Sequence, residues 1–166
     1  IRWWCGEIKS VFGQALTIVK DRIDKNSKEK WQATADDLSY FSLELLNGGL
    51  ANVFMSGVVS HSLGNKTQIF GSEGTIILED KTEEILFAKK GEDFKKLSFE
   101  DPNASLDGVN KGIWNVSVVS LLEELTSAIK ENRSLNEGST FEDGLKNQLV
   151  VDAVFQSTKE RKWIDL

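Results

Sequence analysis

The sequence has very few of the residues that build metal centres, disulfides and nucleophile–histidine pairs. It contains one cysteine, Cys5, and one histidine, His61, in 166 residues. A single cysteine cannot form an internal disulfide, and one histidine with one cysteine does not make a zinc site. A Ser-His-Asp or Cys-His arrangement would have to use His61, and Cys5 lies far from it in the sequence. We therefore expect no disulfide, no metal and a reducing, cytoplasmic setting.

Long apolar runs and basic stretches are also absent. No apolar run approaches the roughly 18 residues that a membrane span needs, and no signal-peptide pattern opens the chain. The net charge of −6 and the lack of a basic stripe argue against a nucleic-acid partner. No Gly-x-Gly-x-x-Gly fingerprint for a dinucleotide is present. The composition is that of an ordinary globular protein, and we expect residues 1–166 to form a single domain.

The stretch from Asp36 to Glu79 predicts an antiparallel meander with one apolar face. Four runs of strand-forming residues alternate with turn residues in it. The tripeptide Asn47 to Gly49 tolerates the positive φ that a tight hairpin needs. We expect Gly71 and Gly74 to bracket a second reversal for the same reason.

The segment before the meander is rich in β-branched residues. Glu7 to Ile23 predicts one long strand with a bulge near Gly13. The polar stretch Asp24 to Thr34 predicts a loop. Ile1 to Cys5 resembles the end of a helix, and Gly6 fits the residue after it, where positive φ is common.

Two helices are expected after the strands. Helical spacing between Ile113 and Asn132 predicts one buried apolar stripe. Its members are Trp114, Val118, Leu121, Leu122, Leu125 and Ile129. A second helix should begin at Thr140, where Thr140 to Asp143 is a variant of the capping box with Asp as its acidic residue. Its expected buried residues are Leu145, Leu149, Val150, Ala153 and Val154. Strands followed by helices predict an α+β fold, an open and mainly antiparallel sheet with helices packed on one face.

Three residues are candidates for polar chemistry. Asp36 and Asp37 could form a carboxylate dyad, but adjacent strand residues point to opposite faces, which favours a role at the start of the strand. His61 follows a strand and could lie at a sheet end beside a pocket, although a surface histidine is the simpler interpretation. The residues alone therefore predict an α+β domain of unspecified activity.

Several short motifs occur in an informative order. They are Arg2-Trp3-Trp4-Cys5-Gly6-Glu7-Ile8, Asp36-Asp37 before a strand, Asn47-Gly48-Gly49, Ile69-Phe70-Gly71-Ser72-Glu73-Gly74-Thr75-Ile76, Phe141-Glu142-Asp143-Gly144-Leu145 with Gln148, and Asp152-Ala153-Val154. In this order and spacing the chain resembles the C-terminal domain of the Gfo/Idh/MocA oxidoreductases, the glucose-fructose oxidoreductase and inositol dehydrogenase superfamily. The resemblance spans nearly the whole chain, and no single motif carries it.

The resemblance implies both a fold and a function. In that family a Rossmann domain that binds NAD or NADP precedes this domain, whose open sheet forms part of the substrate pocket and commonly the oligomer interface. The family's catalytic Lys, Asp and His lie in segments that precede the match to Ile1. We therefore expect no catalytic residue and no bound cofactor in this chain, and no turnover by it alone.

The resemblance also implies partners. The expected substrate is a sugar, polyol or related hydroxyl compound, with Asp37 and His61 lining the pocket at one end of the sheet. The expected protein partners are the chain's own Rossmann domain and further copies bound through the open sheet face.

A function of another class stays open. The chain could be a stand-alone α+β binding or assembly module with no redox partner. The acidic charge fits that alternative, as does the strand from Leu50 to Val59, whose two faces are both partly apolar. A Rossmann sequence upstream of Ile1 would separate the two interpretations.

Overall fold

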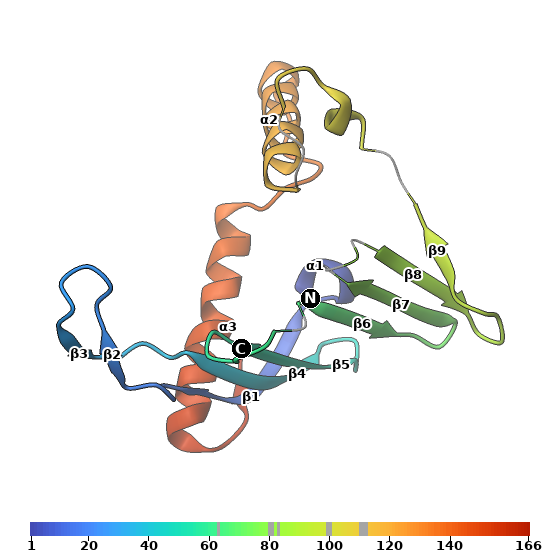
Figure 1. Ribbon diagram of the computed structural model, residues 1–166. Helices are drawn as coiled ribbons and strands as arrows, with labels where there is room; N and C mark the ends of the chain where they lie inside the picture. Colours follow the sequence, from blue (N-terminus) through green and yellow to red (C-terminus); the bar gives the residue numbers. More distant parts are fainter. Residues whose placement is uncertain (63, 80–81, 83, 99–100, 110–112) are drawn as a thin grey trace. The chain divides into compact units, whose positions relative to one another are not determined.

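The computed structural model describes residues 1–166 except 63, 80–81, 83, 99–100 and 110–112 (Figure 1). Its elements are α1 (Arg2–Cys5), β1 (Ile8–Leu16), β2 (Asp21–Ile23), β3 (Lys30–Gln32), β4 (Leu38–Leu45), β5 (Leu50–Ser56), β6 (Lys66–Phe70), β7 (Gly74–Glu79), β8 (Glu84–Lys89), β9 (Lys95–Leu97), the 3-10 helix η1 (Pro102–Ser105), α2 (Ile113–Glu131), α3 (Phe141–Glu160) and β10 (Ile164–Asp165). The chain was expected to form a single domain. Its internal contacts divide it into two compact units, Ile1–Ser60 with Ser139–Leu166, and His61–Gly138.

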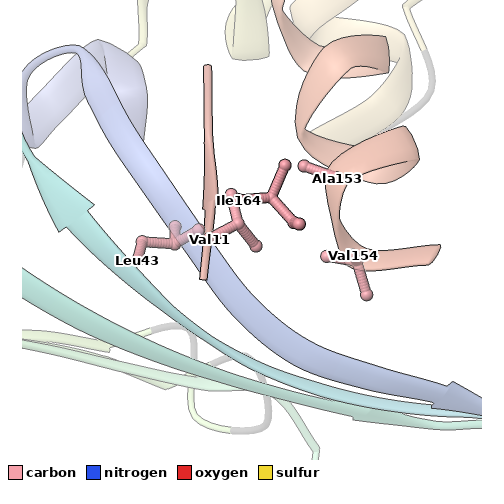
Figure 2. Packing of buried hydrophobic residues seen from close by; sticks show 5 residues of the cluster. All are labelled: Val11, Leu43, Ala153, Val154 and Ile164. Carbon is pink, nitrogen blue, oxygen red and sulfur yellow. The ribbon is translucent and has the colours of Figure 1, made fainter. Parts of the chain in front are cut away.

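The first unit is a four-stranded sheet with a helix on one face. The strand order is β10-β1-β4-β5, and every pairing is antiparallel. Helix α3 packs against β1 and β10. Figure 2 shows the core between sheet and helix. Its buried members are Val11, Leu43, Ala153, Val154 and Ile164. The expected α+β class, with antiparallel strands and helices, is confirmed.

Close approach of β1 to β4 explains the glycine at position 13. A Cβ atom at Gly13 would lie 2.6 Å from the carbonyl oxygen of Tyr40 and 2.7 Å from Cα of Phe41, so no side chain fits. The expected bulge near Gly13 is wrong, because the pairing with β4 is regular there and its register shifts between Ile8 and Ser10 instead.

The outer edge of β1 is covered by two kinds of partner. Strand β10 pairs with Ser10 and Val11. Farther along, the Gly13 N–H donates to Ser157 Oγ at 3.0 Å, and the Ala15 N–H donates to Thr158 Oγ1 at 2.9 Å. Hydroxyl groups of α3 therefore satisfy edge amides that no strand reaches.

The long strand expected over Glu7 to Ile23 is interrupted. Strand β1 ends at Leu16, and β2 pairs with β3 to form a separate two-stranded sheet, here called the β2–β3 ribbon. The expected loop from Asp24 to Thr34 therefore contains a strand. Its turn is built by Asp24, whose Oδ1 accepts from the N–H groups of Asn26 and Ser27. A polar composition marked the turn but concealed the paired residues beside it.

The first hairpin and the N-terminal helix match the expectation. Gly48 has φ of 86°, and the Gly49 N–H donates to Asn47 Oδ1 at 3.0 Å. Asn47 Nδ2 also donates to the carbonyl oxygen of Cys5, which joins the hairpin to the end of α1. Gly6 follows α1 with φ of 106°.

The second unit contains the antiparallel meander β6-β7-β8-β9. The meander expected over Asp36 to Glu79 is therefore divided between two sheets, and Leu63, inside that range, lies outside the described residues. Gly71 and Gly74 do bracket a reversal, but neither has positive φ. A Cβ at Gly74 would collide with the Ala88 carbonyl oxygen of the neighbouring strand, which is the reason for glycine there.

Helix α2 occupies the expected residues but buries other side chains than expected. The predicted stripe is wrong, because its members from Trp114 to Ile129 are 40 to 84% exposed. The buried residues are Val116 and Ala128. Beside them Asn103 of η1 is also buried and donates to Ser120 Oγ and Glu123 Oε2 at 3.0 and 2.8 Å. Apolar periodicity identifies an apolar stripe on this helix. It does not show which face of the helix packs against neighbouring residues.

Helix α3 begins where expected. Thr140 is its N-cap, and the reciprocal hydrogen bonds of a capping box are formed with Asp143. Ala153 and Val154 are buried as expected, whereas Leu145 and Leu149 are exposed, so that part of the expected buried side is wrong. Smaller residues face the sheet instead.

Candidate functional site

Asp37 lies just before β4, and its carboxylate is held from three directions. Oδ1 accepts from the Ile18 N–H at 2.7 Å, and Oδ2 accepts from the Val19 N–H at 3.0 Å and from Arg22 Nη2 at 2.8 Å. The side chain is only 6% exposed. These hydrogen bonds, that from Ile18 first, hold the pKa of Asp37 below its usual range. Asp37 therefore ties the base of the β2–β3 ribbon to the first sheet.

The other two polar candidates are more accessible. Asp36 is exposed next to the nearly buried Asp37, in agreement with a role of the pair at the start of the strand. His61 is exposed and is the first residue of the second unit, whereas Asp37 belongs to the first unit. Within the described residues, no three His, Cys, Asp or Glu side chains are grouped so that they could hold a metal ion.

A shallow hollow of about 180 Å³ lies in the first unit, between α1, the sheet and α3. It is lined by Ile1, Arg2, Ile8, Phe41, Leu43, Asn147 and Val150. Neither Asp37 nor His61 reaches it. Its walls are mostly apolar, with Arg2 and Asn147 as the polar side chains, so it offers few hydrogen bonds to a sugar with many hydroxyls.

Arg2 lines this hollow and joins the start of the chain to the start of α3. Its guanidinium donates to Glu7 Oε1 at 3.0 Å and forms an ion pair with Asp143 at the start of α3. Lys146 approaches Glu7 Oε1 at 3.5 Å from the next turn of α3. The hydrogen bond from Arg2 lowers the pKa of Glu7. The motif at the start of the chain therefore works together with the motif at the start of α3.

The face of the first sheet opposite α3 carries aromatic side chains. Val11 and Leu43 face α3, so the alternate residues Phe12 and Tyr40 face away from it. Tyr40 pairs across the strands with Phe54, and the ring of Phe12 lies 5.7 Å from that of Trp163. We call Phe12, Tyr40, Phe54 and Trp163 the open aromatic face, and all four are exposed.

Polar side chains are interspersed on the open aromatic face. Ser42 Oγ donates to Asn52 Oδ1 at 2.7 Å, and Ser10 Oγ donates to Glu44 Oε2 at 3.0 Å. A surface of exposed aromatic rings among hydrogen-bonding groups is typical of a protein interface or a ligand platform.

An ion pair with strongly shifted pKa values lies at the end of α2 in the second unit. Arg133 Nη1 and Nη2 lie 2.7 and 3.1 Å from the two carboxylate oxygens of Glu124. Glu124 Oε1 also accepts from the Asn136 N–H at 2.5 Å. The Arg133 hydrogen bonds, followed by this amide, lower the pKa of Glu124 to about 2. The pair fastens the chain after α2 and has no catalytic geometry.

Sequence reasoning missed three of these residues. Arg22 and Arg133 belong to segments without periodicity, and Ser157 is a polar residue on a helix face expected to be apolar. Each acts through a partner at a different position in the sequence, and composition carries no signal for such a pairing. The capping box at Thr140 was predictable because all its atoms lie within four residues.

The whole chain, residues 1–166, matches the model of the Gfo/Idh/MocA oxidoreductase family, C-terminal alpha/beta domain. The chain belongs to this family. The similar proteins of known name include the glucose-fructose oxidoreductase domain-containing protein 2 of Xenopus tropicalis, which is 22% identical over 144 residues. That match covers 78% of this chain and 37% of the relative. The Xenopus laevis protein of the same name is also 22% identical, over 145 residues.

Solved structures of the family share the fold. An NAD binding oxidoreductase from Klebsiella pneumoniae is 22% identical with a TM-score of 0.82, over 99% of this chain and 47% of that protein. Levoglucosan dehydrogenase in complex with NADH and L-sorbose is 20% identical with a TM-score of 0.81, over 99% and 46%. This chain therefore spans less than half the length of these family members.

Proposed function

We propose that this chain is the substrate-binding and oligomerisation domain of an NAD(P)-dependent oxidoreductase that acts on a sugar, polyol or related hydroxyl compound. The observation that carries the proposal is the first sheet, which α3 covers on one face and which presents aromatic and polar side chains on the other. A sheet built in this way needs a partner for its second face. Family membership supports a redox enzyme as the whole protein.

The names of structural relatives support the substrate class. Levoglucosan dehydrogenase has been solved with NADH and levoglucosan, and with NADH and L-sorbose. An aldose-aldose oxidoreductase from Caulobacter crescentus has the same fold, with a TM-score of 0.70. By analogy with these relatives, we propose that the present protein acts on a substrate with several hydroxyl groups. We propose NAD or NADP as its nicotinamide cofactor.

The chain's own residues would bind and orient the substrate. NAD or NADP, held by a Rossmann domain of the longer protein, would supply hydride chemistry. Asp37 and His61 are proposed to line the substrate. His61 is exposed, so its imidazole could hydrogen-bond a hydroxyl, whereas the Asp37 carboxylate already accepts three hydrogen bonds. The 166-residue chain alone is expected to be inactive, and the single cysteine suits a cytoplasmic enzyme.

Among the described residues, no helix is long and apolar enough to cross a bilayer.

The experiment uses the full-length protein and the 166-residue chain side by side. NADH and NADPH binding is measured by nicotinamide fluorescence, and turnover is measured at 340 nm with a set of sugars and polyols. We expect binding and turnover only with the full-length protein. A full-length protein that binds neither nucleotide and has no Rossmann sequence upstream would overturn the proposal in favour of a stand-alone assembly module.

A further inference from the structure

The β2–β3 ribbon is the least supported sheet of the first unit. It has two strands and six paired residues, and it extends past the end of β1 and the start of β4 (Figure 1). An isolated two-stranded hairpin is marginally stable in water, since it has no packed face. A ribbon of this kind gains stability when another surface covers it.

Both faces of the ribbon carry a large exposed apolar side chain. Arg22 and Trp31 pair across the strands and share one face, while Ile23 and Lys30 share the other. Trp31 is 49% exposed and Ile23 is 61% exposed. Asp21 and Gln32 share the face of Ile23 and Lys30, so each face of the ribbon places one large exposed apolar side chain among polar ones. A partner that covers the ribbon would bury the apolar surface of Trp31 and Ile23.

The base of the ribbon is firmly fixed. The Asp37 carboxylate binds the Ile18 and Val19 amides and the Arg22 guanidinium, as described above. The Ala33 N–H also donates to the Lys20 carbonyl oxygen at 2.8 Å. These contacts hold both strands together where they leave the sheet, so the ribbon is an arm with a fixed direction rather than a frayed loop.

The charge of the arm is opposite to that of the chain. The ribbon with its turn, residues 21–32, carries four basic and three acidic side chains, a net charge of +1, whereas the whole chain carries −6. Lys25, Lys28 and Lys30, at and beside the turn, are exposed. A second copy of the same acidic chain is therefore an electrostatically complementary partner for the arm.

We propose that the β2–β3 ribbon is a docking arm that binds a second copy of this chain. Trp31 and Ile23 become buried in that contact, and the lysines around the turn face acidic groups of the second copy. Asp37 has a positioning role because it sets the direction of the arm. This interface is separate from the open aromatic face and does not depend on the oxidoreductase activity.

The first test is photo-cross-linking in the full-length protein. Trp31 is replaced by p-benzoylphenylalanine, and tagged and untagged chains of different mass are mixed before irradiation. The control carries the same replacement at Phe94, an aromatic residue that is 50% exposed in the second unit. We expect an adduct between tagged and untagged chains from position 31 and not from position 94. Adducts formed only within one chain, or none from position 31, would overturn the proposal.

The second test keeps every native aromatic residue. Lys25→Glu with Lys30→Glu reverses two charges on the arm, and Lys89→Glu with Lys90→Glu makes the same change on exposed residues of the second unit. Sedimentation should show that the dissociation constant for self-association rises about tenfold or more for the arm pair alone. High salt should reduce this difference. Equal self-association of the two variants would refute the proposal that the ribbon docks to a second copy. NAD(P)H binding should be the same in both, so a failed arm and a failed enzyme assignment give different results.

Discussion

Helix α2 is richer in apolar residues than helix α3, and the two helices also differ in what they bury. Helix α3 presents Ala153, Val154 and Ser157 to the sheet, and all three are buried. Helix α2 leaves its Leu and Trp residues exposed and buries Val116 and Ala128. In both helices the buried positions hold small residues. Close backbone approach, rather than the size of an apolar stripe, decides which face is covered in this fold.

The largest expected loss of stability comes from truncating a core residue of the first unit, and it should far exceed the loss from the same truncation on the α2 stripe. Leu43 is 1% exposed, so Leu43→Ala should lower the free energy of unfolding by about 2–5 kcal/mol through lost contacts and a cavity. Leu121→Ala, on the exposed stripe, should cost much less. Urea unfolding of both variants measures this. Equal losses would mean that the α2 stripe is as buried as the core.

Close approach itself is tested at two glycines. Gly13→Ala forces a Cβ against the backbone of β4 and should destabilise by about 1–3 kcal/mol. Gly144→Ala in α3 meets nothing within 4 Å and should stabilise by about 0.5–1 kcal/mol, because alanine favours a helix. Thermal unfolding of the two variants should therefore shift in opposite directions. A stable Gly13→Ala protein would contradict the tight β1–β4 contact.

The next largest loss of stability should follow removal of the Ser157 hydroxyl, which accepts a hydrogen bond from the edge of β1. Ser157→Ala removes the acceptor of the buried Gly13 N–H and should cost about 1–3 kcal/mol. The matched change on α2 is Thr126→Ala, where an exposed hydroxyl donates to the preceding turn. Hydrogen exchange should rise at the Gly13 amide only in the first variant. No change in exchange there would show that the hydroxyl is dispensable.

The smallest effect should be a pH dependence within the second unit. The folded pKa of Glu124 is lowered from 4.5 to about 2, so its contribution to stability is complete above pH 4.5 and is lost as the pH falls toward 2. Comparison of the wild type with Glu124→Gln isolates the contribution of this carboxylate to stability. The stability difference between wild type and variant should be constant above about pH 5 and shrink toward pH 2. A difference that does not change with pH would argue against the Arg133 pairing.

Local signals explain which parts of the fold were predictable. The cap at Thr140, the positive φ at Gly6 and the Asn47–Gly49 turn depend on residues that are neighbours in sequence. The division of the expected meander depends on which strands meet in space, and so does the identity of the α2 face. Periodicity in the chain carries no information about either.

The candidate site shows the same limit. Asp37 stood out in the sequence as a residue before a strand, and the structure places it there. Its partners Ile18, Val19 and Arg22 were not predictable, because they follow a strand break that β-branched composition concealed. The open aromatic face was predictable as a bare sheet face, whereas its members became clear only from the strand register.

The first unit is assembled from both ends of the chain, with His61–Gly138 inserted between them. Strand β10 and helix α3 complete the sheet that Ile1–Ser60 begins. During synthesis, β1 and β4 are therefore made well before α3, the helix that covers them. The inserted unit emerges from the ribosome in between and can fold first. A premature stop before Thr140 would leave Val11 and Leu43 without cover and expose an aggregation-prone sheet to cellular quality control.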